Sequence, residues 1–349
     1  MQKNPFTLSF GKKPIEYINR YSDEDKIFDI FTGMPVTDQI YMLTGIRGSG
    51  KTVAMSSLCE RIGKLDDWII IKISPVDNIL DALYKNLLYN KKVHQVFVEA
   101  KLDISLFGIN ISVDSNFPDK NLVQAIDDIL KALQKKDIKV LIAIDEVTNT
   151  KQMVRFVSAF QLFITNNRLI FFLGTSLLDE LESLQNVKNL TFLYRAPKEI
   201  LVPLNLKSIT KTYKRVFDIS DKEAASMAFL TKGYPLAFQV LGYVIWESEN
   251  KTIDEKILDE FDERMADVAY TKIWSGLSNN DKKVMMAIES SNTKSVKEIR
   301  ELTNMDINYF NQYRRRLKQR GLIDTTEYGS IEFSLPRFSE FIAFLSFGE

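Results

Sequence analysis

Residues 42–55 read MLTGIRGSGKTVAM, and this stretch decides the fold that the rest of the chain must fit. Three glycines stand between an apolar run and a segment with helical periodicity. The order fits G-x-x-x-x-G-K-[S/T], with Gly45, Gly50, Lys51 and Thr52 in the fixed positions. Glycines let the backbone approach a ligand closely, and the N–H groups that open a helix carry partial positive charge. The stretch therefore predicts a loop that binds a polyphosphate between a strand and a helix.

The motif assigns a role to two side chains. Lys51 is expected to reach the β- and γ-phosphates, and the Thr52 hydroxyl is expected to ligate Mg²⁺. A glycine-rich turn without a ligand is the alternative, and Lys-Thr at both required positions argues against it. The predicted nucleotide-binding residues of the loop are Gly45, Arg47, Gly48, Ser49, Gly50, Lys51, Thr52 and Val53.

A second candidate site segment is VLIAIDE, residues 140–146. A continuously apolar strand ends here in two adjacent acids, Asp145 and Glu146, which a buried strand carries only where a cation or a reaction uses them. Beside a phosphate loop, the first acid is expected to hold Mg²⁺ and the second to act as the general base on water. The pair predicts hydrolysis in addition to binding.

The strand expected over residues 169–176 ends in Thr175 and Ser176. Either hydroxyl can hold the attacking water or the γ-phosphate, and we favour this role for Thr175. For Ser176 a second interpretation fits equally well, namely capping of the helix that follows.

The remaining pattern predicts a doubly wound parallel α/β domain over residues 1–204, because apolar strands alternate with amphipathic helices. A period-two stretch around Gly108 predicts a hairpin insertion at about 101–114. Helices broken at KGYP predict a helical lid over 205–275, and a third domain follows over 276–349.

Composition excludes several classes of protein. Lys plus Arg and Asp plus Glu are both 46, so the chain is not a uniformly basic nucleic-acid coat. One cysteine and one histidine exclude an internal disulfide and a histidine-rich metal site. Neither a membrane span nor a signal peptide is visible, so we expect a cytoplasmic protein.

Together these motifs resemble AAA+-type ATPases, in particular the STAND group and the origin-recognition ATPases. Residues 17–31 resemble the N-terminal box of that family, in which an Arg and an acid, here Arg20 and Glu24, precede an apolar helix beside the adenine. KGYPLAFQVLG resembles its Gly-x-Pro segment, here Gly233 and Pro235, in which the proline packs near the base. The resemblance implies an ATPase that uses ATP and Mg²⁺, with the nucleotide held between the α/β core and the lid. For Gly233 and Pro235 a simple break between two helices is the alternative.

The chain also departs from many AAA+ proteins. PLAFQVLGYVIW lacks the arginine expected after the lid break, which fits STAND proteins better and puts catalysis by a neighbouring subunit in doubt. Arg195 is a candidate for stabilising charge on the γ-phosphate, and a surface salt bridge is an equally good interpretation.

Residues 277–335 resemble a winged helix. On its third helix Ile307, Phe310, Tyr313 and Leu317 share one face at helical spacing. The other face carries amides and arginines that suit base edges and phosphates, within a stretch of ten Lys/Arg and five Asp/Glu over 281–320. Double-stranded DNA is a predicted partner through Asn311, Gln312, Arg315 and Arg316, and a merely solvated face is the alternative.

The sequence thus predicts a slowly hydrolysing ATPase that works as a nucleotide-dependent switch, whose output is a protein contact or self-association. The alternative is a DNA-binding ATPase of the origin-recognition or transposon-associated type. A P-loop protein that binds ATP without turnover is disfavoured by the intact Lys51, Asp145 and Glu146.

Overall fold

The computed structural model describes residues 3–9, 13–76, 78–99, 119–188, 190–249, 251–325 and 329–346. The chain forms two compact units. The sheet unit comprises Tyr21–Thr44 and Lys51–Ile200, and the helical unit comprises Met1–Arg20, Gly45–Gly50 and Leu201–Glu349. The hairpin expected at 101–114 lies outside the described residues.

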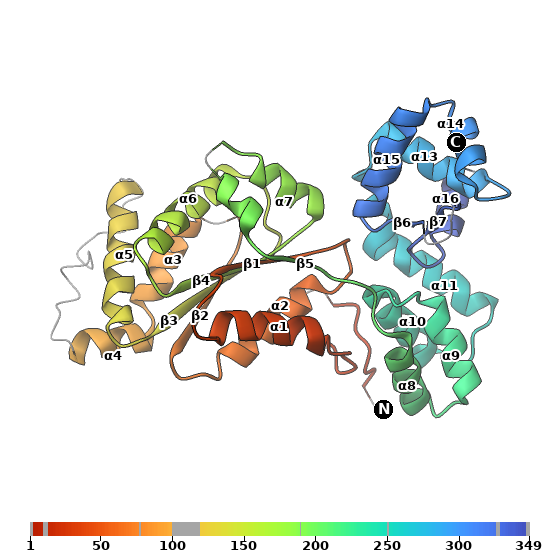
Figure 1. Cartoon of the computed structure of the whole chain (residues 1–349). Helices are drawn as coiled ribbons and strands as arrows, with labels where there is room; N and C mark the ends of the chain where they lie inside the picture. The colour runs from red at the N-terminus through yellow and green to blue at the C-terminus, as the bar shows by residue number, and fades with distance from the viewer. Residues whose placement is uncertain are drawn as a thin grey trace. The chain divides into compact units, whose positions relative to one another are not determined.

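The sheet unit is built on five parallel strands in the order β2-β3-β4-β1-β5 (Figure 1). Strand order departs from chain order, as in a doubly wound sheet, so the predicted α/β fold is confirmed. The strands are β1 (Ile40–Thr44), β2 (Trp68–Ile73), β3 (Lys139–Ile144), β4 (Ile170–Ser176) and β5 (Lys198–Ile200).

Helices cover both faces of this sheet, which explains why its four longer strands are largely apolar. Phe171 and Phe172 are neighbours in β4 and point to opposite faces. Phe171 meets Phe31 of α1 at a ring-centroid distance of 5.5 Å, and Phe172 meets Phe156 of α6 at 5.2 Å. Helices α1 (Tyr21–Thr32) and α2 (Lys51–Ile62) lie on one face (Figure 1). The opposite face carries α3 (Ile79–Leu88), α5 (Asp119–Gln134) and α6 (Lys151–Thr165) (Figure 1).

Three shorter elements complete the described part of the sheet unit. They are α4 (Lys91–Glu99), which the sequence did not predict, α7 (Leu178–Gln185) and a 3₁₀ turn at Thr191–Arg195.

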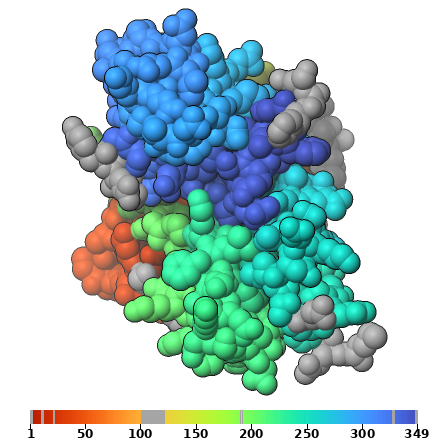
Figure 2. All heavy atoms as spheres, turned by 90° about the vertical axis from the view of Figure 1, so that its right-hand side faces the viewer, coloured from red at the N-terminus to blue at the C-terminus, as the bar shows by residue number. Residues whose placement is uncertain are grey.

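The helical unit buries a single core that runs from Phe6 to Ile342. Figure 2 shows its green, teal and blue parts packed into one body. Helix α11 continues into α12 through a π-helical turn at Ala266–Tyr270. The first part holds α8 (Leu206–Phe217), α9 (Asp221–Leu230), α10 (Pro235–Glu247), α11 (Glu255–Met265) and α12 (Thr271–Ser275). The second part holds α13 (Asn279–Ser290), α14 (Val296–Thr303), α15 (Ile307–Gln319), β6 (Ile323–Asp324), β7 (Glu332–Phe333) and α16 (Phe338–Ser346).

The predicted helical region after the α/β domain is therefore confirmed. Among the helices described, none combines the length and the hydropathy that crossing a bilayer requires.

Candidate functional site

The carboxyl edge of the sheet brings three polar side chains together. Strands β3 and β4 are parallel neighbours, so Asp145, which follows β3, lies beside Thr175 near the end of β4. Thr52 Oγ1, in the first turn of α2, donates to Asp145 Oδ2 at 2.8 Å. Thr175 Oγ1 donates to Asp145 Oδ1. Both carboxylate oxygens are thus held in place by hydroxyl groups from two other elements.

Glu146 has an unusual backbone conformation. Its φ is 55°, in the left-handed region that non-glycine residues rarely adopt. The turn is held because Glu146 N–H donates to Thr175 Oγ1 at 3.0 Å and Val147 N–H donates to Thr175 O at 2.7 Å. Such strain persists only where the surroundings fix it, and it is common at functional sites. The Glu146 side chain itself is exposed.

Thr175 therefore positions the acids, because its buried hydroxyl is engaged with Asp145 and with Glu146 N–H. Ser176 does not cap the following helix, and that interpretation was wrong. The first residue before α7 is Leu177, which makes no side-chain cap bond. Ser176 Oγ donates instead to Val147 O at 2.7 Å and to Leu177 O at 2.9 Å.

Arg195 is not brought together with these residues. It ends the 3₁₀ turn that precedes β5, and β5 runs parallel to β1. Arg195 therefore lies toward the amino edge of the sheet, opposite Asp145 and Thr175. This position does not support a role for Arg195 at a γ-phosphate bound to the same copy of the chain.

The glycine-rich loop Gly45–Gly50 packs inside the helical unit. Its glycines have φ values of 145° at Gly45, 78° at Gly48 and 87° at Gly50, which a side chain would strain. Ser49 is 3 % exposed, and its Oγ has no hydrogen-bond partner among the described residues. A buried hydroxyl without a partner costs free energy, so this atom is suited to meet a ligand.

Two of the residues transferred from the family resemblance, Arg20 and Pro235, lie beside this loop. Arg20 is 8 % exposed, and its Nη2 donates to Ser49 O at 3.0 Å. Gly233, with φ 73°, accepts Leu204 N–H at 2.7 Å. Pro235 opens α10, and a Cβ added to Gly50 would lie 3.8 Å from its ring. Arg20 thus bonds the loop itself and Pro235 lies next to Gly50, whereas Gly233 contacts the chain before α8. Lys51 and Val53 lie in the first turn of α2.

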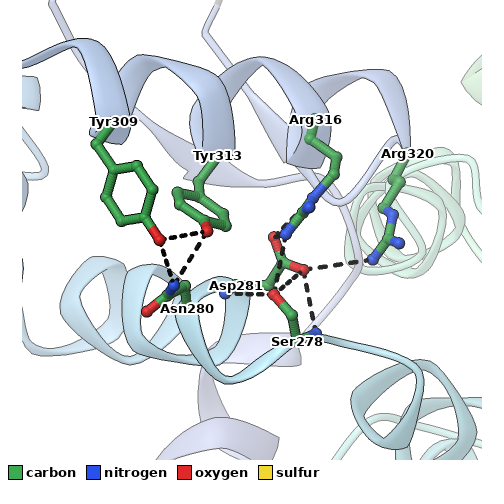
Figure 3. Close-up of polar contacts among 7 residues, drawn as sticks. All are labelled: Ser278, Asn280, Asp281, Tyr309, Tyr313, Arg316 and Arg320. Carbon is green, nitrogen blue, oxygen red and sulfur yellow. Dashed lines mark hydrogen bonds and ion pairs between the residues drawn. The ribbon is translucent and has the colours of Figure 1, made fainter.

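One arginine of the predicted polar face of α15 points toward another helix instead (Figure 3). Arg316 Nε donates to Asp281 Oδ1 at 3.0 Å and its Nη2 donates to Ser278 Oγ at 2.9 Å. The Asp281 side chain is only 1 % exposed, so the arginine neutralises a buried charge. Arg316 is consequently not a free cation for DNA, which corrects the prediction.

Another part of that face lines an open groove of about 650 Å³. None of the described residues that line it is acidic. Arg314, Lys318 and Thr325 were missed by the sequence analysis, although positions 314 and 318 follow 311 at helical spacing. The lining residues are Asn308, Asn311, Gln312, Arg314, Arg315, Lys318 and Thr325.

Comparison with known proteins identifies part of the chain. Residues 33–176 match a family described as an ATPase domain predominantly from Archaea. Residues 267–342 match a domain of unknown function (DUF8462). No curated protein matches the chain.

The fold is similar to that of the Aeropyrum pernix ORC2 protein solved as ADPNP-ADP complexes, with a TM-score of 0.58, 12 % identity and 98 % of each chain covered. The ADP form of the same protein gives 0.50, with 13 % identity and 97 % of each chain covered. The family match supports the predicted ATPase domain over residues 33–176, and the similarity to ORC2 confirms the predicted fold. The assignment to the AAA+ or STAND group, the winged helix and the roles of single residues stay predictions.

Proposed function

We propose that this protein binds ATP with Mg²⁺ through Gly45–Thr52, hydrolyses it slowly, and acts as a nucleotide-dependent switch. The observation that carries the proposal is the arrangement around Asp145, where Thr52 and Thr175 hold the two carboxylate oxygens beside the left-handed Glu146. A hydroxyl and a carboxylate in direct contact form the pair that a hard cation with oxygen ligands requires.

Features of the glycine-rich loop favour nucleotide binding independently of the arrangement around Asp145. Its positive-φ glycines leave room for a phosphate against the backbone, and the buried Ser49 Oγ lacks a partner among the described residues. ORC2, whose fold is similar, was solved with ADPNP and ADP. Lys51 would supply positive charge to the phosphates, and Thr52 and Asp145 would hold Mg²⁺, which neutralises charge on the same phosphates.

Glu146 has the role of general base. In the reaction, a water oxygen attacks the γ-phosphorus and the bond to the bridging oxygen of ADP breaks, which releases phosphate. The carboxylate of Glu146 accepts the proton of that water, and Thr175 fixes the turn from which Glu146 reaches it. We expect low turnover, because Arg195 lies at the opposite edge of the sheet and α10 carries no arginine.

The test is binding of MgATP and release of phosphate by the full chain. Lys51→Ala should abolish nucleotide binding, and Glu146→Gln should keep binding and lose at least about 100-fold in turnover. Lys64→Ala, an exposed lysine just beyond the other end of α2, is the matched control and should behave as wild type. Undiminished turnover in Glu146→Gln would remove the general-base assignment.

A second candidate function is DNA binding by the C-terminal part. Helices α13, α14 and α15 precede the antiparallel hairpin β6–β7, and Ser295 bridges to Ser330, which is the element order of a winged helix. The groove on α15 offers amides for base edges and three cations for phosphates.

Fluorescence anisotropy of duplex DNA, with ATP, with ADP and without nucleotide, at two salt concentrations, tests this second function. Salt-sensitive binding that Arg315→Met weakens would support it. Absence of binding in every state would favour a protein partner or self-association as the output of the switch.

A further inference from the structure

The segment between α9 and α10 contacts the glycine-rich loop through a tyrosine. Tyr234 is 4 % exposed, and its hydroxyl donates to Arg47 O. Two residues further on, Leu236 N–H donates to Gly48 O at 3.2 Å. Both contacts lie within the helical unit, to which the loop belongs.

Together with Arg20, these donors hold three consecutive carbonyl groups of the loop, those of Arg47, Gly48 and Ser49. A trans peptide is planar, so the carbonyl of one residue and the N–H of the next point in opposite directions. Fixing these carbonyls therefore orients the N–H groups of residues 48–50 away from the donors. Ser49 N–H closes a turn onto Ile46 O at 3.2 Å. The N–H groups of Gly48 and Gly50 belong to the stretch expected to face a phosphate.

We propose that Tyr234 is a positioning residue for the phosphate-binding loop, whose hydroxyl sets the affinity for the phosphates of the nucleotide. The inference rests on the proposed ATP binding and names a residue that neither the motif nor the family resemblance assigned. Gly233 and Pro235, on either side of it, were the residues that the resemblance singled out.

The surroundings of Tyr234 suit a hydroxyl that always donates. Burial raises its pKa far above the ordinary value of a phenol, so the hydroxyl keeps its proton at any physiological pH. The ring is tightly packed, because a Cβ on Gly48 would overlap it and would lie 2.9 Å from Leu236 Cδ2. The Tyr234 side chain is therefore packed directly against the loop at Gly48.

Tyr234→Phe tests the inference, because it removes only the hydroxyl. Tyr213→Phe is the matched control, since Tyr213 is also fully buried in the same unit and its hydroxyl donates to Phe238 O at 2.7 Å, away from the loop. Dissociation constants for ATP and ADP are measured directly, and the constant for adenosine is measured by competition with a fluorescent ADP.

We expect Tyr234→Phe to bind ATP and ADP about tenfold more weakly, with adenosine affinity unchanged. Tyr213→Phe should lose thermal stability but bind all three ligands as wild type does. Equal changes in ATP affinity in the two variants, or equal losses of affinity for adenosine and ATP in Tyr234→Phe, would overturn the inference. Either result would mean that the Tyr234 hydroxyl only stabilises the fold. Wild-type protein that binds no ATP would overturn the proposed function as well, so the two failures are distinguishable.

Discussion

The carboxyl edge of the sheet and the outer face of α15 both collect polar side chains, but only the first arranges them around one another. Asp145 is held by two hydroxyl groups, and Glu146 is fixed by its own backbone. On α15, Asn311 and Arg315 face an open groove. A site that is ordered before its ligand arrives is suited to chemistry, because it needs little reorganisation during reaction. A solvated face is suited to a large charged partner, whose binding depends on salt.

The first prediction breaks the carboxyl edge. Asp145→Asn keeps the size of the side chain and removes its charge, so Thr52 and a cation lose their anionic partner. We expect Mg²⁺-dependent phosphate release to fall by about 100-fold or more. Arg315→Met, on the outer face of α15, should leave turnover within about twofold of wild type. Equal turnover in Asp145→Asn and wild type would contradict the assignment of the site.

The second prediction separates two neighbouring arginines of α15. Arg316→Met leaves Asp281 without its closest cation, and we expect a loss of about 2–3 kcal/mol in the free energy of unfolding. Arg320, whose Nη1 lies 3.7 Å from Asp281 Oδ2, keeps the loss from being larger. Arg315→Met should change stability by less than about 0.5 kcal/mol. Urea unfolding measures both variants, and equal losses would show that the buried pair is not what distinguishes these residues.

The same pair also sharpens the DNA question. If duplex DNA binds, Arg315→Met should reduce the slope of log affinity against log salt by about 1. Arg316→Met should leave that slope unchanged while the protein stays folded. The opposite pattern would move the DNA contact to the Asp281 side of α15.

The third prediction uses the strain at Glu146. Glu146→Gly removes the side chain from a left-handed position, which should raise the free energy of unfolding by up to about 1 kcal/mol and abolish turnover. Asp137→Gly is the matched control, because Asp137 is also left-handed, with φ 54°, in the same unit. It should gain similar stability and keep its turnover. Loss of stability in Glu146→Gly alone would mean that the side chain supports the fold.

Sequence reasoning predicted features that one segment contains by itself. The four long strands were found because each is largely apolar, and α2 was found because the motif fixes where a helix must begin. Asp145 and Glu146 were also found from one segment alone, because a buried strand does not end in two carboxylates by chance.

Features that depend on a second segment could not be predicted in this way. The partner of Arg316 is Asp281, on another helix, and no spacing links the two. Ser176 bonds the turn after β3, and Tyr234 bonds Arg47, which is far away in the sequence. Arg195 was a candidate for contact with the γ-phosphate, whereas the direction of β5 puts it at the other edge of the sheet. In each case the deciding fact is which elements are neighbours in space.

The fourth prediction concerns the smallest expected change in stability and tests whether helical spacing alone predicts which residues of α15 are buried. Ile307 shares its helical face with Phe310 and Leu317, yet it is 56 % exposed while the other two are fully buried. It is the first residue of α15, where the helix extends beyond the core that covers its later turns. Ile307→Ser should therefore cost less than about 0.5 kcal/mol, whereas Phe310→Ala should cost about 3–5 kcal/mol because it opens a cavity. Urea unfolding of the two variants compares them, and a loss above about 1.5 kcal/mol for Ile307→Ser would mean that this face is covered in solution.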